Sequence, residues 1–89
     1  MDYANDKIVI WRFGSKGRHP KHIPDAFKGS IATNTLNPPP EVTGVYQNIG
    51  GEWIFWAKNA PYTNLGYLNG GCDYLIFTTG ACTWEIPLQ

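Results

Sequence analysis

The sequence is poor in charged residues and has no long apolar run. Charged residues make up 16% of the 89 residues, below the roughly 25% of an average soluble protein, whereas aromatic residues reach 15%. No apolar run approaches the roughly 20 residues that cross a bilayer. We therefore expect a protein with no membrane contact, whose surface carries apolar and neutral polar side chains.

A secretory leader and a cysteine framework are also missing. The segment MDYANDKIVI lacks the basic start and the apolar run of roughly 7 to 15 residues of a signal peptide, so we expect a cytoplasmic protein. Cys72 and Cys82 are the only cysteines and allow at most one internal disulfide. We expect two free, buried thiols in a reducing compartment, with a disulfide as the alternative in an oxidising one.

The sequence contains no recognised catalytic, phosphate-binding or zinc-binding motif. Neither GxGxxG nor GxxxxGK[ST] occurs. His19, His22 and Asp25, or the two histidines with Cys72 and Cys82, are zinc-ligand types, but their spacing does not match the usual knuckles. No local signature pairs a nucleophile with a base. We therefore expect a binding protein that is not an enzyme and has no cofactor and no metal.

The charges are balanced overall but unevenly placed along the chain. Residues 1–30 hold six basic against three acidic residues, and the remainder holds one against four. A neutral chain with few charges repels itself little, so we expect a homo-oligomer or an obligate binder. The asymmetry permits head-to-tail contact between copies as readily as attraction to an anionic ligand.

Two segments rich in β-branched and aromatic residues predict strands near the ends of the chain. Residues 7–13, KIVIWRF, stop at the glycine-flanked GSKG, and residues 83–88, TWEIPL, form the second. Pro87 belongs at a strand end or on a sheet edge because it cannot donate to the ladder. Trp84 is a predicted core residue.

The intervening N-terminal segment predicts little regular structure. Residues 18–30 contain two prolines and indicate a loop with at most one helical turn, from Pro24 to Phe27. Residues 31–36 suit a short strand, and the NPPP run at 37–40 must be extended. We interpret this run as a spacer; a docking peptide for a proline-binding groove is the alternative.

A sequence motif of 11 residues occurs twice in the second half of the chain. YQNIGGEWIFW, from residue 46, is followed 21 residues later by YLNGGCDYLIF. Each copy indicates a strand, a glycine turn and a second strand, which is a β-hairpin. We therefore predict one all-β domain over residues 1–89, an antiparallel barrel or sandwich built on two successive hairpins. Its parts are a basic strand and loop at 1–36, the spacer at 37–40 and the aromatic hairpins at 41–89.

Alternation along the predicted strands indicates a binding surface. Trp53 and Phe55 share an apolar face assigned to the core, whereas Trp56 shares the other face with charged neighbours. The repeat aligns Trp56 with Phe77, so both rings are expected on one sheet surface. The full predicted set for a protein or glycan partner is Trp56, Phe77, Glu52, Asp73, Asn48 and Asn69.

These features favour a small non-catalytic binding protein that acts through an aromatic protein–protein interface. An inhibitor or regulator of a larger machine, of the kind that phages and mobile elements encode, is the leading interpretation. A glycan-binding module is the alternative, because sugars stack on rings and hydrogen-bond to Asn and Asp. Nucleic-acid or phosphate binding by the basic loop at 14–25 is a second alternative, through Lys16, Arg18, His19, Lys21 and His22.

Overall fold

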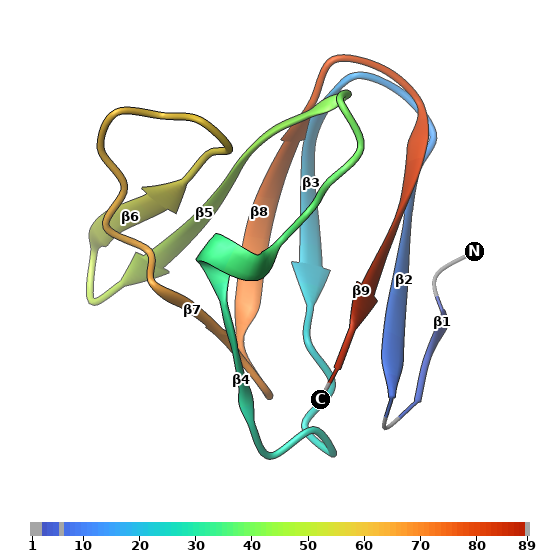
Figure 1. Ribbon diagram of the computed structural model, residues 1–89, viewed down its shortest axis with the longest axis vertical. Helices are drawn as coiled ribbons and strands as arrows, with labels where there is room; N and C mark the ends of the chain where they lie inside the picture. The colour runs from blue at the N-terminus through green and yellow to red at the C-terminus, as the bar shows by residue number, and fades with distance from the viewer. Residues whose placement is uncertain (1–2, 6, 89) are drawn as a thin grey trace.

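Short antiparallel strands account for most of the computed structural model, which describes residues 3–5 and 7–88 (Figure 1). The strands are β1 (Tyr3–Ala4), β2 (Ile8–Phe13), β3 (Gly17–His22), β4 (Ser30–Ala32), β5 (Val42–Ile49), β6 (Glu52–Trp56), β7 (Tyr67–Asn69), β8 (Asp73–Thr78) and β9 (Cys82–Pro87). One turn of 3₁₀ helix, η1, spans Thr33–Thr35. The predicted all-β class with antiparallel pairing is confirmed, and so are the strands near each end of the chain.

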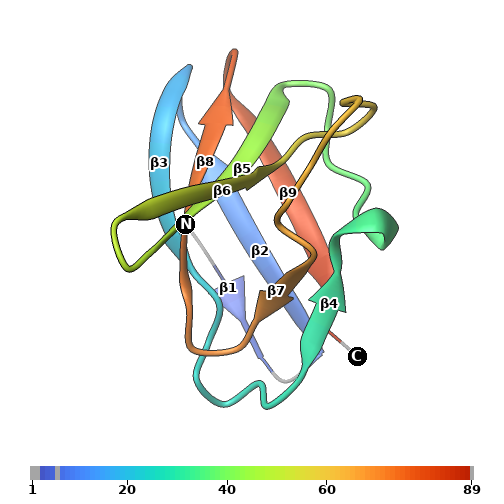
Figure 2. The ribbon, with the colours of Figure 1, turned by 90° about the vertical axis from the view of Figure 1, so that its left-hand side faces the viewer.

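The strands form three sheets that enclose one core. Their orders are β1-β2-β9, β3-β8-β5-β6 and β4-β7, and every pairing is antiparallel. Figures 1 and 2 show the first two sheets as facing layers, with the short β4-β7 pair at one end. Among the described residues no helix is long and apolar enough to cross a membrane.

The two facing layers are joined by a bent ribbon of two chain segments. The β2–β3 segment pairs with the β8–β9 segment, from Phe13 opposite Cys82 on one side of the bend to Gly17 opposite Thr78 on the other. Figure 1 shows both connections passing side by side over the same end of the molecule. The Thr78 hydroxyl donates to the Ser15 carbonyl at 2.9 Å and holds the two segments together at the bend. Strands that switch sheets in this way form the corners of packed sheets.

Aromatic and branched side chains fill the space between the layers. Trp11 and Trp84 pack edge to face with ring centroids 5.8 Å apart, an arrangement that the ring quadrupoles favour. Trp84 is 2% exposed, so its predicted core position is confirmed. The other buried apolar residues include Val9, Phe13, Ile23, Val45, Trp56, Leu65, Leu68, Tyr74, Ile76 and Ile86.

The first copy of the repeat forms the predicted hairpin. β5 and β6 pair from Val45 opposite Trp56 to Ile49 opposite Glu52. The two-residue loop has positive φ at both Gly50 (60°) and Gly51 (90°), which is the conformation of a type I′ turn. Two glycines are needed here because side chains disfavour that conformation.

The second copy also reads strand, glycine turn, strand, but its strands do not pair with each other. β7 pairs with β4, whereas β8 lies between β3 and β5. The expected second hairpin is therefore wrong. The turn at Gly70 and Gly71 instead carries the chain from the small sheet into the centre of the large one.

Three local predictions in the first half of the chain are corrected. Residues 18–30 are not all loop, because β3 occupies 17–22 and pairs with β8 along its whole length. The expected helical turn from Pro24 to Phe27 is a reverse turn, closed by Phe27 N–H donating to the Pro24 carbonyl at 3.2 Å. The helical turn lies instead at Thr33–Thr35, within the segment expected to be a strand at 31–36.

Gly70 provides a sharp test of the packing between that turn and the 23–29 loop. A Cβ atom on residue 70 would lie 1.6 Å from the Phe27 carbonyl oxygen, which belongs to the backbone and cannot rotate away. We expect Gly70→Ala to lower the free energy of unfolding by about 1–3 kcal/mol, measured by urea denaturation. Gly66→Ala is the matched control, because nothing lies within 4 Å of its added Cβ. Equal stability of the two variants would contradict the close approach.

Candidate functional site

Five aromatic rings gather on the outer side of the four-stranded sheet. Tyr46 of β5 stacks on Phe55 of β6 (centroids 5.6 Å apart) and contacts Phe77 of β8 (4.8 Å). Phe55 in turn meets Tyr62 of the following loop at 6.4 Å. Trp53 lies on the same side as Phe55 by strand alternation. We call Tyr46, Trp53, Phe55, Tyr62 and Phe77 the outer aromatic face.

The structure reverses the predicted sides of β6. Trp56 is 7% exposed and belongs to the core, whereas Trp53 is 55% exposed. The reason is the hairpin register, which sets Trp56 opposite the buried Val45. Both sides of EWIFW are largely apolar, so alternation alone could not choose between them. The two-residue glycine turn was the signal that could have identified this register.

The predicted site set is therefore only partly brought together. Phe77 and Asp73 lie on the outer side of β8, but Trp56 and Glu52 belong to the other side of β6 by alternation. The repeat thus aligns residues that lie on opposite sides of one sheet. Sequence reasoning missed Tyr46, Trp53, Phe55 and Tyr62 as surface rings.

The two asparagines predicted to belong to the binding surface, Asn48 and Asn69, lie on different sheets. The Asn48 side chain accepts a hydrogen bond from Gly51 N–H at 3.1 Å in the hairpin turn and lies beside the outer aromatic face. Asn69 lies on β7 in the small sheet, where its backbone N–H donates to the Tyr74 hydroxyl at 2.7 Å. Burial raises the pKa of Tyr74 to about 12, so this phenol stays neutral and fixes the 69–74 turn.

A shallow hollow opens on the outer side between β3, β8, β5 and β6. Its volume is ≈ 240 Å³. The residues that line it are Pro20, Tyr46, Asn48, Trp53, Asp73, Tyr74 and Leu75. Apolar side chains form most of this lining, and Asn48 and Asp73 supply polar groups. The hollow can therefore accept an apolar group while a carboxylate and an amide remain within reach.

His22 links two carboxylates at the border of the hollow. Its Nδ1 lies 2.6 Å from Asp73 Oδ1, and its Nε2 lies 3.0 Å from Asp25 Oδ1. The hydrogen bond to Asp73, followed by that to Asp25, raises the pKa of His22 above its usual 6.5. The two carboxylates occupy different ring nitrogens and so do not converge on one point. No group of three His, Cys, Asp or Glu side chains in residues 3–5 and 7–88 is arranged to hold a metal ion.

The other basic residues predicted to bind anions do not form one cluster. Alternation along β3 places Arg18 and His22 on the outer side and His19 and Lys21 on the inner side. His19 packs against the Phe13 ring at 5.1 Å, and the Lys21 ammonium lies 5.1 Å from the centre of the same ring. Lys16 lies in the bend that precedes β3. These cations are thus divided between two sides of the sheet.

Cys72 and Cys82 are free thiols and are half-buried. Burial, and then the charge of Glu41, raises the pKa of Cys82. The expectation of unpaired thiols is confirmed, although neither side chain is fully buried.

The linkage of His22 predicts a pH dependence of stability. A raised pKa in the folded state means that the stabilisation is fully present below the unfolded pKa of about 6.5 and is lost as pH rises through the folded pKa. We expect the free energy of unfolding to fall as pH rises from about 6.5 through the folded pKa of His22, and to fall less in His22→Gln. In an NMR titration, Asp73→Asn should lower the pKa of His22 more than Asp25→Asn does. Equal effects of the two variants would show that Asp73 is not the stronger partner.

Comparison with known proteins adds no assignment to this geometry: no protein-family model, no curated protein and no solved structure matches the chain.

Proposed function

We propose that the protein binds a protein partner through the outer aromatic face. The observation that carries this proposal is the exposure of Trp53 (55%) and Tyr62 (66%) beside the contacting rings of Tyr46, Phe55 and Phe77. Contiguous exposed apolar surface of this kind is characteristic of interaction sites. Trp and Tyr are also the residues that most often dominate the energy of protein interfaces.

The arrangement of the rings favours a partner with a shaped apolar surface. The half-buried rings are held by contacts with one another and by the strands beneath them, so little side-chain freedom remains to be lost on binding. Arg18 and the His22–Asp73 pair supply a polar border on the β3 side. An apolar centre with a polar border is the usual organisation of a protein interface.

The biological role that we propose is that of a small inhibitor or regulator of a larger assembly. A chain of 89 residues with this binding face suits a protein that occupies a surface on another protein. A second copy of the chain is one such partner, because the balanced charge opposes self-association only weakly. Free thiols at Cys72 and Cys82 fit the reducing conditions of the cytoplasm.

Matched substitutions of exposed residues test the binding face. Trp53→Ala and Tyr62→Ala remove rings from it, whereas Ile49→Ala and Tyr67→Ala remove similarly exposed side chains (56% and 58%) elsewhere. We expect the first pair to weaken capture of a partner from source-cell extract about tenfold or more, as truncation of an interface hot spot does. The second pair should leave capture unchanged.

Light scattering on the same four variants separates a foreign partner from a second copy. A dimer of the wild type that dissociates in Trp53→Ala but not in Ile49→Ala would identify self-association through the face. If all four variants captured the same proteins and kept the same mass as the wild type, the proposed face would be wrong.

A glycan is the second candidate ligand, and the hollow is the observation that favours it. Trp53 lies there with Asn48 and Asp73, which can accept hydrogen bonds from hydroxyl groups. Trp53 is exposed whereas the other three tryptophans are buried, so a sugar that stacks on it should protect the tryptophan fluorescence from acrylamide quenching. Trp53→Phe should abolish that response. An unchanged signal across sugar classes would exclude the glycan and leave the protein partner.

A further inference from the structure

The backbone of β9 has an edge that no described strand pairs with. β9 is the last strand of the β1-β2-β9 order and pairs with β2 alone among residues 3–5 and 7–88. The Leu88 N–H donates to the Lys7 carbonyl at 2.7 Å, so these two residues point their backbone groups at each other. This pair fixes which alternate residues of β9 hydrogen-bond to β2. Alternation then directs the backbone groups of Cys82, Trp84 and Ile86 to β2. Those of Thr83 and Glu85 point to the other edge.

By contrast, both edges of the four-stranded sheet, β3 and β6, are blocked against the addition of a further strand. The Ile23 N–H donates to the Cys72 carbonyl, so by alternation Arg18, Pro20 and His22 direct their backbones to the free edge of β3. Pro20 has no N–H and interrupts that edge. At the β6 edge the N–H groups of Asn64 and Leu65 both donate to the Phe55 carbonyl. The β9 edge has no such block at Thr83 or Glu85, since Pro87 stands at its end.

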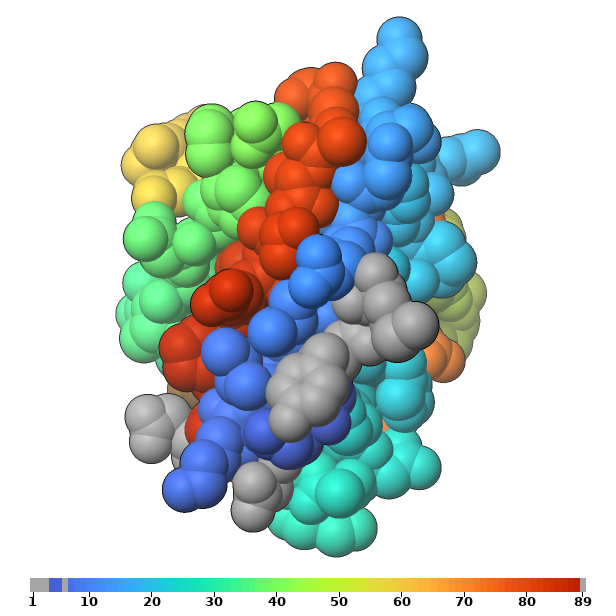
Figure 3. All heavy atoms as spheres, turned by 90° about the vertical axis from the view of Figure 1, so that its right-hand side faces the viewer, coloured from blue at the N-terminus to red at the C-terminus, as the bar shows by residue number. Residues whose placement is uncertain are grey.

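A groove runs along this unblocked edge. It holds ≈ 820 Å³ between β9 and the Pro38–Pro40 segment, and a second hollow of ≈ 430 Å³ continues it through shared Asn37, Trp84 and Glu85. Figure 3 shows the outer side of this sheet, with β2 on one side of β9 and the green segment around residue 40 on the other. These volumes are in the range of ligand sites.

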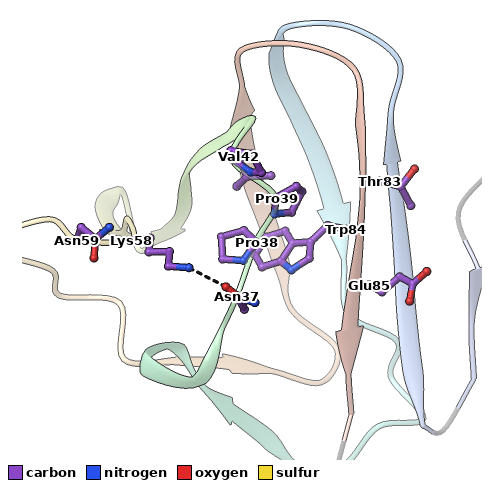
Figure 4. Close-up of a pocket in the computed structure, with 10 residues that line it drawn as sticks. Asn37, Pro38, Pro39, Val42, Lys58, Asn59, Thr83, Trp84 and Glu85 are labelled. Atoms are coloured by element: carbon purple, nitrogen blue, oxygen red, sulfur yellow. Dashed lines mark hydrogen bonds between the residues drawn. The ribbon is translucent and has the colours of Figure 1, made fainter.

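The two walls of the groove differ in what they offer an occupant. Figure 4 shows Trp84 pointing toward Pro38, whereas the side chains of Thr83 and Glu85 point to the other side of β9. Thr83 and Glu85 line the groove nonetheless, which is what their outward backbone groups predict. The opposite wall of three prolines has no N–H to donate. An occupant can thus form a ladder with β9 on one side while apolar rings contact it on the other.

The charges beside β9 select the occupant. Glu85 is exposed on the strand. Glu41 lies near the other end of β9, where its charge adds to burial in raising the pKa of Cys82. The Lys58 ammonium stands across the groove and donates to Asn37 Oδ1 at 2.6 Å. Arg12 of β2 lies opposite Thr83 on the outer side of the sheet, so Glu85 is the acidic position on the strand itself, and a Lys or Arg paired with Glu85 is favoured.

We propose that the β9 edge binds an extended segment of a partner protein with a basic residue opposite Glu85, which adds to the β1-β2-β9 sheet as a further antiparallel strand. In this mode main-chain hydrogen bonds supply affinity, and alternate side chains supply specificity. Residues opposite Thr83 and Glu85 point to the outer side, and the one opposite Glu85 is basic. The residue opposite Trp84 points into the groove and is apolar. This surface is separate from the outer aromatic face, so either proposal can fail alone.

The probe is a capped synthetic peptide of alternating lysine and valine, compared with the same peptide in which glutamate replaces lysine. The lysine peptide should slow hydrogen exchange at the Thr83 and Glu85 amides and shift their NMR signals. Methylation of the lysine backbone nitrogens, which face β9, should abolish binding, whereas methylation of the valine nitrogens should be tolerated. Equal binding of both methylated peptides would overturn the strand-addition mode.

Two substitutions in the protein complete the test. Thr83→Pro removes one outward N–H and no hydrogen bond of the β2–β9 ladder, and should weaken binding about two- to tenfold in a protein whose spectrum stays native. Thr83→Val, which keeps the N–H, should bind as the wild type does. Glu85→Lys should transfer the preference to the glutamate peptide. Unchanged affinity in Thr83→Pro, or shifts confined to the outer aromatic face, would overturn the proposal. Protection of these amides that rises with protein concentration without peptide would do so too, by assigning the edge to a second copy.

Discussion

One continuous pairing of two chain segments organises this protein. β2 and β3 pair with β9 and β8 in a single register that continues across the bend, since three residues separate Phe13 from Gly17 and three separate Thr78 from Cys82. Because the register is conserved through the corner, alternation carries over from one sheet to the other. The side of the ribbon that faces inward in the first sheet therefore continues into the core side of the second.

This constraint decides which side chains are buried and which sheet edges remain. Trp11 and Trp84 fall opposite each other on the inner side, and Ile76 follows on the inner side of β8. β5 adds to β8 and brings the Gly50–Gly51 hairpin, whose register buries Trp56 and turns Trp53 outward. The outer aromatic face is thus a consequence of a core register.

The sequence was sufficient for the strand class, the end strands, the glycine turn and the core position of Trp84, because each depends on local pattern. The sequence was insufficient where a strand pairs with a segment far away along the chain. The sequence of β3 contains Pro20 and therefore predicts a loop, yet a proline whose backbone faces the free edge of a strand removes no ladder hydrogen bond. Alternation alone assigns Trp53 and Trp56 to the wrong sides because EWIFW is apolar on both, so the pairing with β5 decides which side is buried. The similarity of the two repeat copies also predicts a second hairpin. In the structure β7 pairs instead with β4, which lies farther away in the sequence.

The positions of the prolines distinguish the two surfaces proposed for binding. Pro20 and Pro87 both stand where the ladder phase directs the backbone away from the neighbouring strand, so neither removes an internal hydrogen bond. At β3 the proline lies in mid-strand, where it prevents further pairing, so the binding proposed for that sheet depends on the rings of its outer side. At β9 the proline lies at the end, and Thr83 and Glu85 keep their outward donors. The same physical rule therefore closes one sheet to strand addition and leaves the other open to it.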